Sequence, residues 1–198
     1  MSRPATRPGA DILLADGSPA RVRQIRPTDA DAIIRLHARL SERTRYLRYF
    51  SAFPRIPTRD LERHVNVDHH EREAFVIELG GEIIAVGQYD RLGPTAVNAE
   101  VAFVVEDAYQ RRGLGSVLLE HLAAAAREEG IGNFVADVLP VNATMLRVFA
   151  DAGYPVTVLW AIDTIDWRRV ADGGPTAAES AAKVLAGRAA GAVVLMHL

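Results

Sequence analysis

The sequence has no cysteine and almost no lysine. Without cysteine, the chain of 198 residues can hold no disulfide, no thiolate metal ligand and no cysteine nucleophile. Lys183 is the only lysine, so arginine supplies 22 of the 23 basic residues, an excess that is typical of a GC-rich genome. These absences exclude disulfide-stabilised scaffolds, Cys-ligated zinc sites and thiol enzymes.

The chain also lacks an excess of charge of either sign and a long apolar run. Its formal net charge is −2 and its pI is near 6.3, whereas nucleic-acid-binding domains are usually basic. No apolar run reaches the roughly 18 residues of a membrane-spanning helix, and no apolar segment follows the N-terminal positive charge as in a secretory signal. We therefore expect a cytoplasmic protein that binds neither nucleic acid nor a membrane.

The order of apolar patterns predicts a mixed α/β fold in a single domain. Residues 1–20 are expected to form a loose N-terminal arm with one hairpin at Asp16-Gly17, and residues 21–168 the domain itself. Residues 169–198 are rich in alanine and glycine and are expected to be a tail, or a linker to a further domain. The apolar end, 191–198, could complete the sheet or begin that further domain, and the pattern does not distinguish the two.

Within the domain, the spacing of apolar residues separates strands from helices. Thr28 is expected to be the N-cap of the first helix. Gly130 is expected to end the long helix that follows the strongest strand. The predicted strands cover 22–25, 74–79, 83–89, 100–105, 134–139 and 156–160, and the predicted helices cover 29–40, 41–50, 59–68, 113–129 and 143–152.

The segment from Val104 to Ser116 is the most informative part of the chain. A buried strand ends there, a loop with two arginines and two glycines follows, and a long helix begins. The first N–H groups of a helix have no internal acceptor, and together with the helix dipole they bind anions. Gly113 and Gly115 remove the Cβ atoms that would keep a phosphate from the backbone. The pattern therefore predicts a phosphate or pyrophosphate site, although Gly-x-Gly alone would also suit an ordinary turn before a helix.

Two longer motifs connect this segment with a known family. Gln110–Gly115 (Gln-Arg-Arg-Gly-Leu-Gly) matches the [Gln/Arg]-x-x-Gly-x-[Gly/Ala] signature of the GNAT superfamily of acetyl-CoA-dependent N-acetyltransferases, and Pro140–Tyr154 resembles a later segment of that family. The resemblance covers about residues 20–165. Arg23–Asp29, Tyr46–Phe50 and Leu139–Arg147 resemble bacterial protein lysine acetyltransferases of the Pat type. The resemblance implies the GNAT fold, a mostly antiparallel sheet flanked by helices.

The same resemblance implies acetyl-CoA as cosubstrate and no metal. In the family, main-chain groups of the strand before the loop bind the pantetheine arm, and N–H groups of the loop and helix bind the pyrophosphate. Asn142 would face the arm from the other side, or cap the following helix, or do both. The implied cofactor-binding residues are Phe103, Val104, Val105, Gln110, Arg111, Arg112, Gly113, Leu114, Gly115, Ser116 and Asn142.

Glu100 is the implied catalytic residue. Pat-type relatives carry their catalytic carboxylate at this position, and a lysine amine, with a pKa near 10.4, must lose a proton before it attacks. The structural alternative is a solvated glutamate at the end of a strand. Phe149 stands where many family members have the tyrosine that protonates the leaving thiolate, so we expect no dedicated tyrosine acid.

Two charged segments have a structural and a functional interpretation. Asp68–Glu71 (Asp-His-His-Glu) contains metal-ligand residue types, but it lacks the His-Glu-x-x-His spacing and is expected to be a polar loop. Residues 21–64 contain 11 arginines and five acids. We expect these arginines to form ion pairs on a solvated helix surface, with an acidic protein partner or the CoA 3′-phosphate as the alternative ligand.

These observations together predict an acetyl-CoA-dependent N-acetyltransferase that acts by direct attack in a ternary complex. The resemblance to Pat-type enzymes implies a lysine side chain of a protein as the acceptor, with an acyl-CoA synthetase as the candidate partner. The alternatives are a small-molecule amine acetyltransferase on the same fold and a non-catalytic acetyl-CoA-binding regulatory module.

Overall fold

The computed structural model describes residues 7–49, 54–136, 138, 142–151, 160–163 and 193–195. The chain divides into two units, 1–136 and 137–198, and each is considered by itself. The domain limits expected from composition, at residues 20 and 168, stay predictions.

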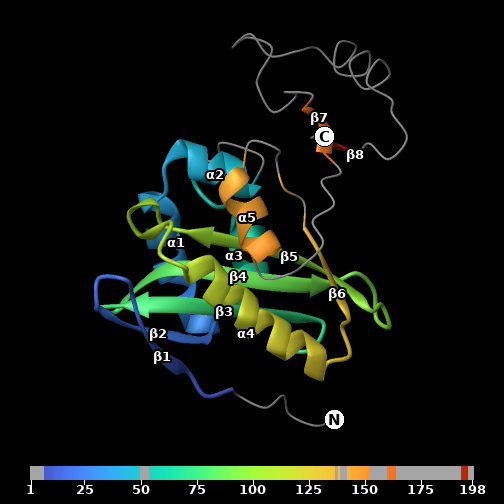
Figure 1. Ribbon diagram of the computed structural model, residues 1–198, viewed down its shortest axis with the longest axis horizontal. Coiled ribbons are helices and arrows are strands. Elements are labelled where there is room, and N and C mark those ends of the chain that lie inside the picture. Colours follow the sequence, from blue (N-terminus) through green and yellow to red (C-terminus); the bar gives the residue numbers. More distant parts are fainter. Residues whose placement is uncertain are drawn as a thin grey trace. The chain divides into compact units, whose positions relative to one another are not determined.

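The first unit is built on an open six-stranded sheet (Figure 1). Its strands lie side by side in chain order, and every neighbouring pair is antiparallel except the last, which is parallel. This confirms the mixed, mostly antiparallel sheet. The strands are β1 (Ala10–Leu13), β2 (Pro19–Gln24), β3 (Arg72–Leu79), β4 (Glu82–Arg91), β5 (Asn98–Val105) and β6 (Asn133–Val135). The predicted hairpin at Asp16-Gly17 joins β1 to β2, so part of the expected N-terminal arm is the edge strand of the sheet.

Helices cover both faces of this sheet. On one face, Ile33 and Leu36 of α1 (Ala30–Arg39) and Val65 of α3 (Thr58–Val65) pack with alternate strand residues such as Val76 and Val104. On the other face lies α4 (Leu114–Glu128), which crosses the strands in Figure 1. α2 (Glu42–Tyr49) follows α1 and contacts β5.

The close approach of α4 to the sheet depends on a glycine in β4. A Cβ atom on Gly87 would lie 2.7 Å from the ring of Phe103 and 3.2 Å from the Cβ of Leu118. Any larger residue would have to displace one of these side chains. The missing side chain therefore lets β5 and α4 pack closely just before the loop that connects them.

The start of the first helix differs from the sequence prediction. Thr28 is not its N-cap: residues Pro27–Asp29 form a 3-10 turn, and α1 begins after Asp29. The carboxylate of Asp29 accepts hydrogen bonds from the Arg23 guanidinium at 2.7 and 2.9 Å and from the Arg26 N–H at 2.8 Å. The long-range pair with Arg23 organises this end of the helix, which local capping preferences do not reveal.

The second unit contains α5 (Ala143–Asp151), where an apolar helix was predicted. β7 (Trp160–Asp163) and β8 (Val193–Leu195) pair in parallel as a separate two-stranded sheet. The predicted strand over 156–160 shares only Trp160 with β7, and its other residues lie outside the described part. The described residues of the apolar C-terminal segment, Val193–Leu195, pair with β7 and do not join the six-stranded sheet. No helix in the described part of the chain combines the length and apolar character that crossing a bilayer requires.

Rings from three helices of the first unit pack against one another. The ring centroids of His37 (α1) and Tyr49 (α2) lie 5.5 Å apart, and those of Tyr49 and His64 (α3) lie 6.4 Å apart. His64 is 8% exposed, and neither of its ring nitrogens has a hydrogen-bond partner among the described residues. Burial, with added repulsion from nearby arginines, lowers the pKa of His64 to about 3.

We expect His64 to make the fold sensitive to acid. The unfolded chain takes up a proton near pH 6.5 and the folded chain does not, so the free energy of unfolding falls as the pH drops below 6.5. At pH 5 the loss from this group is about 2 kcal/mol. His64→Phe should remove this loss. Urea unfolding at pH 7.5 and at pH 5.0 measures it, and the fall in the free energy of unfolding between the two pH values should be smaller in the variant than in the wild type by that amount.

His70 is the matched control for this experiment. Its hydrogen bond to Glu129 raises its pKa, so its contribution to stability is present at low pH and is lost as the pH rises. His70→Phe should therefore change the pH dependence in the opposite direction. Equal pH dependence of unfolding in the wild type and His64→Phe would contradict the prediction.

Candidate active site

The loop between β5 and α4 has the backbone geometry of an anion site. Two of its residues have left-handed backbone conformations: Arg111, with φ of 61°, and Gly113, the N-cap of α4, with φ of 81°. The first hydrogen bond of the helix runs from Val117 N to Gly113 O at 3.1 Å. The N–H groups of Leu114, Gly115 and Ser116 precede it and have no acceptor within the helix.

This geometry fits a diphosphate. Successive residues of left- and right-handed conformation turn their N–H groups toward a common concavity, and the positive end of the α4 dipole adds to the field. No Cβ fills the space beside Gly113, where a Cβ atom would have no neighbour within 4 Å among the described residues. The residues from Arg111 to Ser116 therefore fit the phosphate end of acetyl-CoA.

The two arginines of the loop differ in their surroundings. Arg111 is exposed, whereas the guanidinium of Arg112 lies 2.7 Å from the Asp16 carboxylate and 5.4 Å from the centre of the Tyr109 ring. Sequence reasoning assigned the charge of both to the phosphate site. In the structure Arg112 is already paired with the β1–β2 turn, so Arg111 is the better candidate for a phosphate contact.

Gln110, the first residue of the motif, points into the protein. Its side-chain amide donates to Val105 O at 3.0 Å and to the Thr44 hydroxyl at 3.1 Å. The side chain therefore connects the end of β5 to α2 rather than facing solvent. Contact of Gln110 with the cofactor stays a prediction for its main chain.

β6 pairs with only the first part of β5. Asn98–Glu100 pair with Asn133–Val135, and within the described residues β6 ends there while β5 continues to Val105. The part of β5 beyond this pairing is the place expected for the pantetheine arm, beside Phe103, Val104 and Val105. The side chains of Phe103 and Val104 are buried, so only their main-chain groups suit that role.

Glu100 lies in a row of charged residues across the sheet. It is exposed, and its registered partners are Asp90 on β4 and Val135 on β6; Arg72 on β3 is in turn the partner of Asp90. Residues in register share one face, with side chains about 5 Å apart. Asp90 forms ion pairs with Arg63 at 3.1 Å and Arg72 at 3.2 Å.

This row adds a residue that sequence reasoning missed. Asp90 lies beside Glu100 and pairs with Arg72 of the row and with Arg63 of α3, so two carboxylates and two arginines gather here. The Gly80-Gly81 turn joins β3 to β4, but the register shifts by one residue between Ile77 and Glu78, so counting back from the turn does not place Asp90 opposite Arg72. The register of β4 against β5 depends on a longer loop and cannot be counted from the sequence either.

Asn142 precedes α5 in the second unit. Its side-chain oxygen accepts a hydrogen bond from Met145 N at 3.3 Å, which confirms the predicted capping role. A contact with the cofactor arm stays a prediction.

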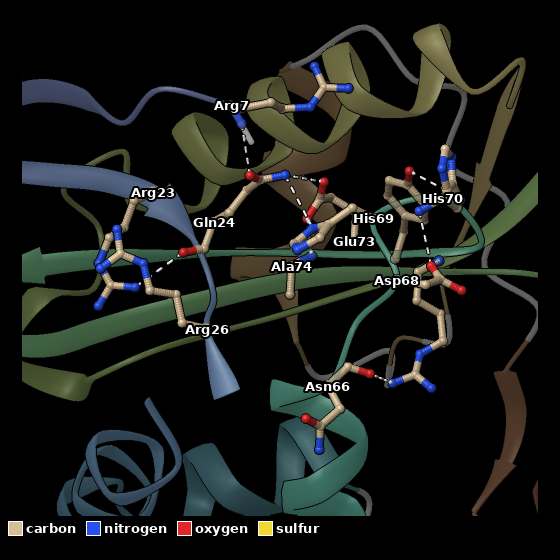
Figure 2. Close-up of polar contacts among 12 residues, drawn as sticks. Arg7, Arg23, Gln24, Arg26, Asn66, Asp68, His69, His70, Glu73 and Ala74 are labelled. Atoms are coloured by element: carbon tan, nitrogen blue, oxygen red, sulfur yellow. Dashed lines mark hydrogen bonds and ion pairs between the residues drawn. The ribbon is translucent and has the colours of Figure 1, made fainter. Parts of the chain in front are cut away.

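The Asp68–Glu71 loop is bound into a polar network (Figure 2). The buried carboxylate of Glu73 accepts from Gln24 Nε2 at 2.8 Å and from the N–H of Ala74 at 2.9 Å, and it lies 2.8 Å from His69 Nδ1. The hydrogen bond to Glu73 raises the pKa of His69. Among the described residues no three potential ligands surround a common metal position.

The arginines of residues 21–64 form several ion pairs. Arg39 lies 3.0 Å from Glu106 and Arg35 lies 3.2 Å from Glu82. Ion pairing therefore accounts for part of the local positive charge. Contact with an acidic partner or with the CoA 3′-phosphate stays a prediction.

Comparison with known proteins places these features in a family context. The family model described as "Acetyltransferase (GNAT) family" matches residues 37–154. The chain is 35% identical over 135 residues to the acetyltransferase Pat of Mycolicibacterium smegmatis. The aligned region covers 67% of this chain and 40% of that relative. The chain therefore spans about 40% of the length of this relative.

Solved structures agree on the fold. The GNAT domain of S. lividans PAT has 44% sequence identity and a TM-score of 0.71, over 74% of this chain and 88% of that chain. An aminoglycoside N-acetyltransferase in complex with CoA shares the fold at a TM-score of 0.56 and 16% identity, over 76% of this chain and 97% of that chain.

Proposed function

Because this chain belongs to the GNAT family of acetyltransferases, we propose that it transfers an acetyl group from acetyl-CoA to a lysine side chain of a protein. The observation that carries the proposal is the strand–loop–helix from β5 to α4, which combines a diphosphate-fitting loop with an exposed carboxylate on the preceding strand. The similarity to two Pat proteins supports the choice of acceptor. An acyl-CoA synthetase is the proposed class of target protein.

Two parts of the chain would bind acetyl-CoA, the loop before α4 and the end of β5. The N–H groups from Arg111 to Ser116 would hold the diphosphate, and main-chain groups of Phe103–Val105 would align the pantetheine arm. Acetyl-CoA supplies the acyl group as a thioester, whose thiol is a fair leaving group with a pKa near 8.5. No acyl-enzyme is needed, in agreement with a chain that has no cysteine.

Glu100 is proposed as the general base. At pH 7 the neutral form of a lysine amine, with a pKa near 10.4, costs about 4.6 kcal/mol. Glu100 would accept the amine proton, directly or through a water. The nitrogen forms a bond to the acyl carbon, the carbon–sulfur bond breaks, and the sulfur leaves as thiolate.

The surroundings of Glu100 suit a lysine presented by a large substrate. Glu100 is exposed on the sheet, and its registered neighbour Val135 is 40% exposed. A lysine side chain can place its aliphatic stem on such a surface while its amine meets the carboxylate. The cytoplasmic location and the absence of nucleic-acid and membrane partners stay predictions.

Incubation with labelled acetyl-CoA tests the proposed acceptor. The panel contains an acyl-CoA synthetase, lysine peptides and small amines, with the transfer site located by mass spectrometry. We expect label on a protein lysine, with kcat/KM at least about tenfold above that of any small amine, because contacts around the lysine add to transition-state binding.

Other outcomes would change the conclusion. Preferential labelling of a small amine would favour the small-molecule enzyme. Binding of acetyl-CoA without turnover of any amine would favour a regulatory binding module. A target in which the labelled lysine is replaced by arginine is the control for site-specific transfer.

A further inference from the structure

The diphosphate-fitting loop contains a conformation that must be held in place. Arg111 has a φ of 61° although it carries a Cβ, and such left-handed conformations are unfavourable for residues other than glycine. They persist where the surrounding structure fixes the backbone on either side. The residue directly before Arg111 is Gln110, so its contacts decide how the loop begins.

Gln110 is held by a buried hydroxyl of α2. Its amide donates to Thr44 Oγ1 at 3.1 Å, and Thr44 is 8% exposed. The same hydroxyl donates to Asp107 Oδ1 at 2.7 Å. The Thr44 hydroxyl therefore accepts from Gln110 and donates to Asp107, and Ser41 Oγ is a further donor neighbour at 3.2 Å. Only a hydroxyl can accept and donate through one atom at this position.

Asp107 completes the connection on the other side. It also accepts from the Ser41 hydroxyl at 2.7 Å and from Ser41 N at 2.9 Å, so the start of α2 is attached to the segment that enters the loop. Burial opposes ionisation of Asp107, but the hydrogen bonds from Ser41 and Thr44 outweigh it, so its pKa lies below the ordinary range. Asp107 is thus a charged acceptor for both hydroxyl groups.

We propose that Thr44 is a positioning residue for the diphosphate loop: by joining Asp107 to Gln110, its hydroxyl fixes the N–H groups of residues 111–116 in the geometry that binds acyl-CoA. The inference rests on the proposed function, because acyl-CoA is the ligand it assigns to the loop. The hydrogen bonds of Thr44 and Asp107 also join the start of α2 and the loop into one unit. A shift of α2 then changes the affinity for the cosubstrate.

Removal of the hydroxyl tests this role. Thr44→Val keeps the size and β-branching of the side chain but loses both hydrogen bonds. We expect its Kd for CoA, measured by calorimetry on the full chain, to rise about five- to tenfold. The KM for acetyl-CoA should rise in parallel, whereas kcat at saturation should stay within about twofold because Thr44 touches no reacting atom.

Three further variants separate positioning from general destabilisation. Thr44→Ser restores the hydroxyl and should bind CoA as the wild type does. Thr58→Val, at an exposed position of α3, is the matched control and should leave the Kd unchanged. In a Gln110→Leu background, Thr44→Val should add little to the loss, because both changes break the same connection.

The outcomes are distinct. An unchanged Kd in Thr44→Val, a Thr44→Ser variant as weak as Thr44→Val, or full additivity with Gln110→Leu would overturn the inference alone. If Thr44→Val does not fold, an unchanged Kd in Gln110→Leu would overturn it. Failure of the wild-type chain to bind CoA would overturn both this inference and the proposed function.

Discussion

Replacement of Glu100 by glutamine should lower kcat by at least about 100-fold while leaving the affinity for CoA unchanged. The amide has nearly the same shape but cannot accept the amine proton, and general-base catalysis is typically worth 10²–10⁴ in rate. Glu100 lies five residues before the end of β5, about 17 Å along the strand from the loop, so cosubstrate binding should not respond. Steady-state kinetics and CoA calorimetry on the same samples measure the two effects.

Glu120→Gln provides the matched control for this prediction. Glu120 is an exposed glutamate on α4, and the same substitution there should change neither kcat nor CoA affinity. The residual activity of Glu100→Gln should also lose the acidic limb of its pH profile. A variant that keeps a third or more of the wild-type kcat would show that Glu100 is not the base.

The row beside Glu100 illustrates what sequence reasoning could not reach. The strand and its exposed glutamate follow from local pattern, because alternation and a motif downstream identify β5. Asp90 and Arg72 enter only through strand register, and Arg63 comes from α3. Register and helix placement depend on packing across the whole sheet, which a one-dimensional pattern does not contain.

The loop shows the same division between local and long-range information. Glycine spacing predicted the turn into α4, and the structure has the left-handed Gly113 there. The pairing of Arg112 with Asp16 and of Gln110 with Thr44 joins residues 96 and 66 positions apart. Both contacts bind side chains of the motif to distant parts of the chain, which residue type and spacing alone do not reveal.

Replacement of Gly113 by alanine should weaken the binding of CoA by at least about tenfold. Gly113 has a φ of 81°, and an alanine there either accepts the strain or moves the backbone toward a right-handed conformation. The second response rotates the N–H groups that would meet the diphosphate, and a new Cβ occupies the open side of the loop. Calorimetric titration with CoA measures the loss, which corresponds to about 1.4 kcal/mol for each factor of ten.

Gly130 offers a control with the same backbone problem at the other end of the same helix. Its φ is 73°, and a Cβ on it would also have no neighbour within 4 Å in the part of the chain that the structure describes. Both alanine variants should lower the free energy of unfolding by about 1 kcal/mol, since the conformational strain is alike. Only Gly113→Ala should lose CoA affinity, because the N–H groups around Gly113 belong to the proposed site and those around Gly130 do not. Equal loss in both variants would mean that the affinity follows the stability of α4, and the loop would then have no special role in binding.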